Sequence, residues 1–180
     1  AFVLLLVTAP LIAMAALLIW LEDRGPAFYS QRRSGWLGRE FTVFKLRTMS
    51  VQPLDSPPEW TQPGDQRITK VGSLLRKVRL DELPQLFNVL IGEMSLIGPR
   101  PERPELERQL EKSIPHYRKR HWMRPGLSGW AQVSAPYASS IEESDLKLSY
   151  DLFYIKNFNT WLDVSIAIRT IKIILKAAGR

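Results

Sequence analysis

The sequence contains no cysteine and only two histidines, and these absences exclude several kinds of chemistry. Without cysteine the chain can form neither a disulfide framework nor a thiolate zinc site. His116 and His121 are the only imidazoles, and so small a number disfavours a histidine metal site. Any bound metal is therefore expected to be a hard cation, held by carboxylate or phosphate oxygens.

Charge is also missing from the first part of the chain. None of the 25 Lys+Arg and 18 Asp+Glu residues precedes Glu22, although the 180-residue chain carries a net charge of +7. The uncharged run is almost entirely apolar, and a helix of about 20 residues is long enough to cross the hydrocarbon core of a membrane. We therefore expect a membrane segment over residues 1–22 and one basic globular domain over residues 23–180. Because the chain begins at Ala1 without methionine, we expect that its N-terminus has been trimmed.

A proline leaves two topologies open for the membrane segment. Pro10 kinks or breaks a helix, because proline lacks a backbone N–H and its ring clashes with the preceding turn. The Thr8 hydroxyl could satisfy a carbonyl freed in this way. The segment is either a kinked single span, which composition favours, or a helix-break-helix hairpin that enters and leaves by the same leaflet. The arginines that follow place the domain in the cytoplasm: Arg24, Arg32, Arg33 and Arg39.

Alternating apolar and polar residues from Glu40 to Met49 predict a β-strand. One face of this strand is expected to carry Phe41, Val43, Lys45 and Arg47. The other expected elements are, in chain order, a turn over 34–38, a proline-rich loop over 50–66, a helix over 70–79, a helix that begins near 81, a tight turn over 98–101 and a charged helix over 102–111.

The C-terminal stretch predicts an amphipathic helix that begins near Trp161. Its basic face carries Arg169, Lys172 and Lys176. Its opposite face carries Val164, Ile168, Ile171 and Leu175. A basic amphipathic helix with an aromatic edge suits the membrane interface, but the same pattern suits a helix packed on the core, and both alternatives stay open.

Asp81 and Glu82 form the first candidate site. Adjacent side chains on a helix point about 100° apart, so the two carboxylates cannot face each other as an acid/base pair. They suit separate tasks, one as a nucleophile and one as a metal ligand. The alternative is structural: Asp81 caps a helix with Pro84 in its first turn, and the helix dipole favours Glu82. Capping and catalysis are compatible, because a helix N-terminus also attracts phosphate.

Cations form the second candidate feature, and five are expected near this pair: Lys45, Arg47, Arg76, Arg100 and Arg124. Arginine in a rigid turn suits bidentate phosphate recognition, although each cation alone also fits a solvated surface. With two carboxylates and no useful His or Cys, the set indicates Mg-assisted phosphoryl transfer. P-loop, GxGxxG, GxSxG, HExxH and DxD motifs are absent, which disfavours a Rossmann kinase, a hydrolase or a familiar nucleotide-sugar glycosyltransferase.

Four ordered stretches resemble the bacterial sugar transferase family of monotopic phosphoglycosyl transferases, and the resemblance covers nearly the whole chain. These stretches are GPAFYSQRRSGWLGREFTVFKLRTM, RLDELPQLFNVLIGEMSLIGPRP, RPGLSGWAQV and SYDLFYIKNFNTWLDVSI. The resemblance implies transfer of a sugar-1-phosphate from a UDP-sugar to undecaprenyl phosphate, with release of UMP. Such a reaction is the first membrane step of polysaccharide or glycoprotein glycan assembly.

The same resemblance implies a role for each candidate residue. Asp81 matches the nucleophile that forms a covalent phosphosugar-enzyme, and Glu82 matches the residue that binds Mg²⁺. The positions that match the phosphate-contacting arginines and the surrounding basic site are Arg76, Arg100, Lys45, Arg47 and Arg124.

The family also implies a fold and a location. Its N-terminal segment is a re-entrant helix broken at Ser-Pro or a similar pair, so Ala9-Pro10 resembles that break, with Thr8 in place of the serine hydroxyl. The expected fold is α+β, a mostly helical membrane-associated domain with a re-entrant helix hairpin, a small β-hairpin and amphipathic interfacial helices. The expected location is the bacterial inner membrane, with the catalytic domain on its cytoplasmic face. The expected partners are a UDP-sugar, undecaprenyl phosphate and membrane lipids without nucleic acid, while a homodimer and further N-terminal membrane helices stay open.

Two other functions fit part of the pattern. A membrane-tethered basic module that binds anionic lipid or another polyanion without catalysis would share the charge and the amphipathicity. A catalytically inactive relative could act as a scaffold. The adjacent carboxylates of Asp81 and Glu82 favour an enzyme, because a lipid-binding module does not need them among its cations.

Overall fold

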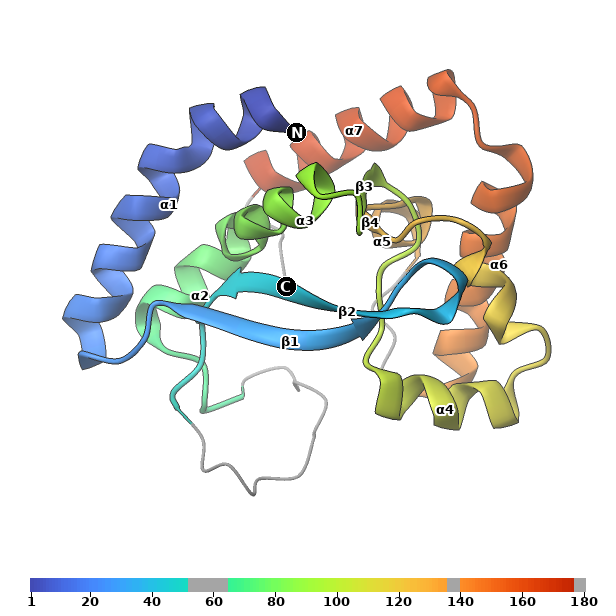
Figure 1. Cartoon of the computed structure of the whole chain (residues 1–180), viewed down its shortest axis with the longest axis horizontal. Helices are drawn as coiled ribbons and strands as arrows, with labels where there is room; N and C mark the ends of the chain where they lie inside the picture. Colours follow the sequence, from blue (N-terminus) through green and yellow to red (C-terminus); the bar gives the residue numbers. More distant parts are fainter. Residues whose placement is uncertain (52–64, 136–139, 177–180) are drawn as a thin grey trace.

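A computed structural model describes residues 1–51, 65–135 and 140–176, and Figure 1 shows their arrangement. In chain order the elements are α1 (Phe2–Asp23), β1 (Phe28–Ser34), the short 3₁₀ helix η1 (Trp36–Gly38), β2 (Glu40–Leu46), α2 (Lys70–Lys77), the 3₁₀ helix η2 (Leu80–Gln85), α3 (Leu86–Leu90), β3 (Ser95–Ile97), α4 (Pro104–Ser113), the 3₁₀ helix η3 (Tyr117–Trp122), β4 (Gly126–Ser128), α5 (Trp130–Ser134), α6 (Ile141–Asn157) and α7 (Thr160–Leu175). This is the predicted α+β class, with two small two-stranded sheets among helices. Most of the predicted loop over 50–66 lies outside the described residues.

The segment predicted to enter the membrane is one bent helix, α1, and not two helices separated by a non-helical break. Pro10 lies inside it and has no N–H, so the Leu6 carbonyl loses its helical donor. The Thr8 hydroxyl does not replace that donor, because it donates to Leu4 O at 2.7 Å. The expectation that Thr8 satisfies the freed carbonyl is therefore not met, and the re-entrant topology stays a prediction.

Most of α1 is exposed, and its C-terminal half is the part that packs on the domain. Among the described residues, α1 is the one helix long and apolar enough to cross a membrane. Ala15 and Ile19 are buried in a cluster with Leu46 of β2 and Leu75 of α2. The Glu22 carboxylate accepts the first backbone N–H of α2 at 2.9 Å. The end of α1 is therefore fixed to both elements.

The predicted strand is confirmed as β2, which pairs antiparallel with β1 around the η1 turn. Phe41 and Val43 are buried and form a cluster with Met94. Side chains alternate along a strand, so Lys45 follows on the same face and reaches η2. The strand ends at Leu46, so Arg47 lies beyond it and not on the predicted strand face.

The chain turns sharply between α2 and η2. Arg79 has a positive φ of 53°, which is uncommon for a residue with a side chain. The α-helix expected from about Asp81 is instead η2 followed by the short α3. Asn88 is fully buried and ties α3 to the hairpin by donating to Thr42 O at 2.7 Å. This tie fixes η2 beside β2.

The C-terminal helix α7 is attached to the domain by one side only. Ile166 is fully buried, and α7 contacts α5, β3 and β4. The apolar side chains predicted for one face of the helix are exposed, and the most exposed is Trp161 at 84%. The others are Val164, Ile168, Ile171 and Leu175. Figure 1 shows α7 along the edge of the molecule that also carries α3 and the N-terminal end of α1.

Candidate active site

Glu82 is the buried centre of a charged cluster drawn from three segments. Its carboxylate accepts hydrogen bonds from Lys45 Nζ at 3.0 Å and from Arg100 Nη2 at 2.5 Å. Its second oxygen lies 3.4 Å from Arg100 Nη1. Lys45 stands on β2, 37 residues before Glu82, and Arg100 lies in the turn after β3, 18 residues beyond it. The fold thus brings together three residues that the sequence predicted for one site.

Opposite charges determine the ionisation of this cluster. Burial alone would raise the pKa of Glu82, but the charges of Arg100 and Lys45 outweigh it and hold that pKa well below its usual value. The negative charge of Glu82 raises the pKa of Arg100. Burial lowers the pKa of Lys45, and Glu82 opposes that effect. Glu82 and Arg100 are therefore charged at neutral pH.

Asp81 lies beside this cluster but is not paired in the same way. No donor among the described residues hydrogen-bonds its carboxylate. Burial and then the charge of Glu82 raise the pKa of Asp81 to about 6, while Lys45, Arg76 and Arg100 act to lower it. Its role as a helix cap is not observed, since Arg79 occupies the position before η2. An ionised carboxylate that lacks hydrogen bonds keeps its lone pairs available for attack on an electrophile.

Arg76 is within electrostatic reach of Asp81, as predicted. Its Nε donates to Thr48 Oγ1 at 2.9 Å. One turn earlier on α2, Gly72 packs so closely that a Cβ there would lie 2.1 Å from the Thr48 carbonyl oxygen. Glycine at this position lets α2 lie against the chain beyond β2, and that contact orients Arg76.

Two further arginines contribute to the site, and sequence analysis missed both. Arg79 interacts electrostatically with Glu82 and Asp81, although burial lowers its pKa. Arg33 on β1 forms an ion pair with Glu102 at 3.8 Å and also interacts with Glu82. The position of Arg79, two residues before Asp81, was a usable signal. Arg33 had no such signal, because only the pairing of β1 with β2 brings it near.

The structure places Arg47 outside the cluster, contrary to the prediction. Its guanidinium is buried and donates to both Asp23 oxygens, at 2.6 and 2.5 Å. Its Nε donates to Pro26 O at 2.6 Å. The hydrogen bonds with Asp23 raise the pKa of Arg47, and those from Arg47 lower the pKa of Asp23 to about 2. Arg47 therefore fastens the end of α1 to the chain just beyond β2, and each of its three guanidinium nitrogens donates to Asp23 or to Pro26.

Arg124 also lies apart from the cluster, and its predicted place in the basic site stays a prediction. It is exposed, and its guanidinium carbon lies 5.5 Å from the ring centre of Trp36. It lines a groove of about 620 Å³ between the N-terminal end of α1, β3 and α7. Within the described residues Arg124 makes no hydrogen bond or ion pair with Asp81 or Glu82.

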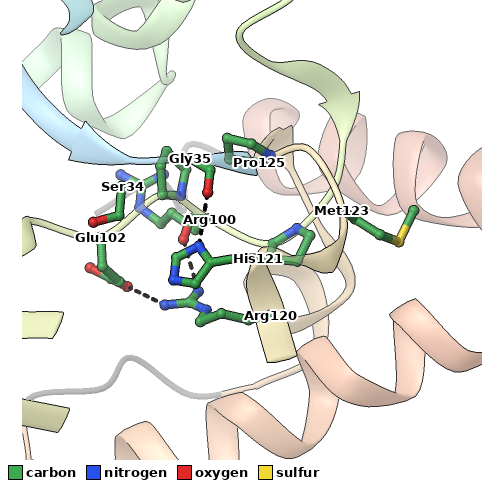
Figure 2. A pocket seen from close by; sticks show the side chains of 10 residues that line it. Ser34, Gly35, Arg100, Glu102, Arg120, His121, Met123 and Pro125 are labelled. Carbon is green, nitrogen blue, oxygen red and sulfur yellow. Dashed lines mark hydrogen bonds and ion pairs between the residues drawn. The ribbon is translucent and has the colours of Figure 1, made fainter. Parts of the chain in front are cut away.

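The turn that presents Arg100 depends on a glycine. The N–H of Gly98 donates to Ser128 O at 2.8 Å. A Cβ at this position would lie 2.4 Å from the carbonyl oxygen of Arg124, so only glycine lets the two chain segments approach. Figure 2 shows the other side of this turn, where Arg120 and His121 surround a cavity of about 10 Å³.

The oxygen donors at the site fit a hard divalent cation. Mg²⁺ commonly binds one or two carboxylates together with substrate phosphates and water. Asp81 and Glu82 supply two adjacent carboxylates, and within the described part of the chain one Glu82 oxygen has only the 3.4 Å contact with Arg100. The predicted role of Glu82 as a magnesium ligand is therefore chemically consistent with this geometry.

A second group of potential metal ligands lies away from the site. Ligand atoms of Glu107, Glu111 and His121 lie within 4.8 Å of one another. His121 is hydrogen-bonded to Glu107 and, at 2.9 Å, to Gly35 O. Glu111 pairs with Arg118 at 3.4 Å. These contacts give each member of the group a protein partner.

The site joins two adjacent carboxylates to several cations in an α+β domain that also exposes apolar helix faces. The family model for the bacterial sugar transferases matches residues 1–177, and the chain belongs to this family.

Three relatives are similar to nearly the whole length of this chain. The UDP-N-acetylgalactosamine-undecaprenyl-phosphate N-acetylgalactosaminephosphotransferase of Aeromonas hydrophila is 47% identical over 171 residues, which are 95% of this chain and 40% of the relative. The undecaprenyl-phosphate glucose phosphotransferase of Komagataeibacter xylinus is 42% identical over 176 residues, 94% of this chain and 33% of the relative. An uncharacterised sugar transferase of Bacillus subtilis is 38% identical over 180 residues, 99% of this chain and 85% of the relative. The chain thus spans less than half the length of the first two relatives.

Proposed function

We propose that the chain transfers a sugar-1-phosphate from a UDP-sugar to undecaprenyl phosphate and releases UMP, which would begin the assembly of a polysaccharide or glycoconjugate. The observation that carries this proposal is the Asp81 carboxylate, which has a raised pKa and stands beside a Glu82 held by two cations. The names of the relatives support the two substrates, since they pair nucleotide sugars or sugar phosphotransfer with undecaprenyl phosphate.

The proposed reaction has two displacement steps at one phosphorus. In the first, an Asp81 oxygen attacks the phosphorus that bears the sugar, and the bond from that phosphorus to the bridging oxygen breaks. The bridging oxygen leaves with UMP, and the sugar phosphate stays on Asp81 as a mixed anhydride. In the second, a phosphate oxygen of undecaprenyl phosphate attacks the same phosphorus, and the bond to Asp81 breaks. The carboxylate is regenerated, and a soluble donor and a lipid acceptor use one pocket in turn.

The surrounding cations have a defined task in this scheme. Lys45, Arg76, Arg79 and Arg100 supply fixed positive charge where the donor pyrophosphate enters. Such preorganised charge stabilises the developing negative charge better than water does, because it needs no reorganisation during the reaction. Mg²⁺ held by Glu82 and by donor phosphate oxygens would offset the charge on the leaving UMP.

We further propose that the chain is associated with the bacterial inner membrane, with residues 1–22 inserted from the cytoplasmic face and residues 23–180 forming the catalytic domain. Exposed apolar side chains on three helices support this proposal: those of α1, those of the α7 face, and Phe87 and Leu90 of α3, which Ile91 follows directly. An apolar surface of this extent needs a partner. Arg24 lies 4.1 Å from the ring centre of Trp20, a pairing suited to the headgroup region.

The test uses purified protein with Mg²⁺, undecaprenyl phosphate and a panel of UDP-sugars that includes UDP-N-acetylgalactosamine and UDP-glucose. We expect UMP release with at least one UDP-sugar, and repeated turnover only when undecaprenyl phosphate is present. Binding to anionic vesicles without UMP release from any sugar would instead support the non-catalytic basic module.

A further inference from the structure

The turn that carries Arg100 depends on donors from outside the turn. Pro99 and Pro101 flank Arg100, and neither has an N–H with which to build a local ladder. Their carbonyls are nevertheless occupied: Pro99 O accepts from the Gly126 N–H at 2.9 Å, and Pro101 O accepts from Arg33 Nη1 at 3.2 Å. The carbonyl of Arg100 itself accepts from Arg120 Nη2 at 2.8 Å. This last contact is the one that reaches the backbone of the residue bound to Glu82.

Arg120 is held rigidly by its other contacts. Its side chain is 3% exposed, and its Nη2 also donates to Asp151 Oδ2 at 2.8 Å. Its Nη1 donates to Tyr117 Oη at 2.7 Å. A buried guanidinium costs much free energy unless it is paired, and these partners satisfy that requirement. The planar fork of arginine allows all three acceptors to be reached at once, which a lysine ammonium could not do.

Helix α6 contributes two side chains that hold the turn in place. Asp151 is 2% exposed and fixes Arg120. One turn earlier, Lys147 donates to Glu102 at 2.5 Å. Glu102 follows the turn directly, so one face of α6 controls the turn through Arg120 and through Glu102. Figure 2 shows Arg120 pointing toward Glu102 and toward the Arg100 segment.

We propose that Arg120, held by Asp151, is a positioning residue that orients Arg100 toward Glu82. The inference rests on the proposed function, because it gives Arg100 a task in catalysis. Arg120 touches neither carboxylate of the site and acts through the carbonyl of Arg100. A displacement of about 1 Å at a catalytic group can lower the rate about 100-fold, so the backbone position of Arg100 matters for its two contacts with Glu82.

Two variants remove this support in different ways. Arg120→Lys keeps the positive charge and loses the fork. Asp151→Asn keeps the shape and an acceptor oxygen and loses the charge that holds Arg120. The matched control is Tyr154→Phe, which also removes a polar contact of α6, the partly buried hydrogen bond to Asp163 at 2.7 Å, but is not directed at the turn. We expect both test variants to lower kcat/KM about tenfold or more, and the control to change it less than about twofold.

A double-mutant cycle separates positioning from general stability. The cycle pairs each test variant with Arg100→Lys. If Arg120 acts through Arg100, each test variant should lower kcat/KM by less than about twofold in the Arg100→Lys background, although the Tm still falls. An equal loss in both backgrounds, a loss of the same size in Tyr154→Phe, or no loss in the wild-type background would overturn the proposal. If Arg120→Lys does not fold, Asp151→Asn decides the outcome.

A second measurement does not require turnover. The ¹⁵N–¹H signal of the Arg100 guanidinium is assigned by its loss in Arg100→Lys. We expect this signal to shift in Arg120→Lys and Asp151→Asn and to stay in place in Tyr154→Phe. An unmoved Arg100 signal in both test variants overturns the positioning role. Absence of UMP release by the wild type would instead count against the proposed function, so the two failures are distinguishable.

Discussion

Two buried ion clusters lie on either side of the turn over 98–101, and they differ in how their carboxylates are paired. In the first cluster, on the side of the turn that faces α6, Asp151 forms an ion pair with Arg120, and Glu102 forms one with Lys147. In the second cluster, Glu82 accepts hydrogen bonds from Lys45 and Arg100, but the adjacent Asp81 has no hydrogen-bond donor among the described residues. The second cluster therefore contains one carboxylate that the fold does not neutralise.

The pKa values of three carboxylates show how burial and ion pairing compete. Burial raises the pKa of Asp151, although the charge of Arg120 acts to lower it. Burial would raise the pKa of Glu102, but the charges of Lys147, Arg120 and Arg33 lower it to about 2. Burial and a neighbouring carboxylate raise the pKa of Asp81 to about 6. The same residue types thus stabilise a shape in one cluster and prepare a reactive group in the other. Asp81 differs from Asp151 in lacking a hydrogen-bond donor among the described residues, and not in its raised pKa alone.

The largest expected effect follows from removing the unpaired carboxylate. Asp81→Asn should lower UMP release at least about 10³-fold, because no nucleophile remains for the first displacement. The raised pKa means that the folded state holds the Asp81 proton more tightly than the unfolded state, so the ionised group costs stability above pH about 6. At pH 7.5 the variant should therefore unfold at a Tm no lower than that of the wild type. Normal UMP release by Asp81→Asn would remove the distinction between the two clusters.

The next effect tests which arginines belong to the site. Arg100→Ala should lower kcat/KM for the UDP-sugar about 100-fold, because a preorganised charge is lost where negative charge develops. Arg124→Ala is the matched arginine substitution outside the cluster, and we expect a change of a few-fold at most. Steady-state kinetics measures both. Equal losses in the two variants would place Arg124 back in the site.

A smaller effect is expected from pH. Asp81 must be ionised to attack phosphorus, and its pKa is raised to about 6. Log kcat/KM should therefore fall by about one unit per pH unit below that value and level off above it. A pH–rate profile in buffers of constant ionic strength measures the pH at which log kcat/KM begins to fall. An apparent pKa near the ordinary aspartate value of about 4 would contradict the role of burial and of Glu82 in raising the pKa of Asp81.

The smallest catalytic effect is expected at Arg47. Arg47→Lys loses the two-pronged contact with Asp23 and should lower the Tm of unfolding, while kcat/KM for the UDP-sugar changes less than about twofold. Lys77→Arg, on the neighbouring helix α2, provides a charge-conserving control that should leave both quantities unchanged. Lost activity at an unchanged Tm would restore the phosphate-binding role that the sequence suggested.

Local patterns predicted much of the fold. Alternation from Glu40 located β2, and helical spacing located α2 and α7. The exposed stripe of α7 follows the same spacing, because amphipathicity is a property of neighbouring turns. The 3₁₀ character of η2 was not predictable in this way, since the positive φ of Arg79 reflects how α2 and η2 pack and not a preference of arginine.

The sequence predicted the candidate site in part, and the errors of that prediction have physical causes. Asp81, Glu82, Lys45 and Arg100 were identified correctly as neighbours. Arg47 was misassigned because extending the strand alternation past Leu46 gave it the same face as Lys45. Its partner, Asp23, lies 24 residues earlier, at a separation that no local pattern covers.

The central claim is that Asp81 carries the sugar phosphate between donor and acceptor. It is tested most directly by incubating the protein with Mg²⁺ and a reactive UDP-sugar in the absence of undecaprenyl phosphate, followed by intact and peptide mass spectrometry. We expect a mass increase of one sugar phosphate on the peptide that contains Asp81, no such increase in Asp81→Asn, and loss of the added mass when the lipid is supplied. UMP release that depends on the acceptor with no adduct at any stage, or an adduct on Glu82, would contradict it.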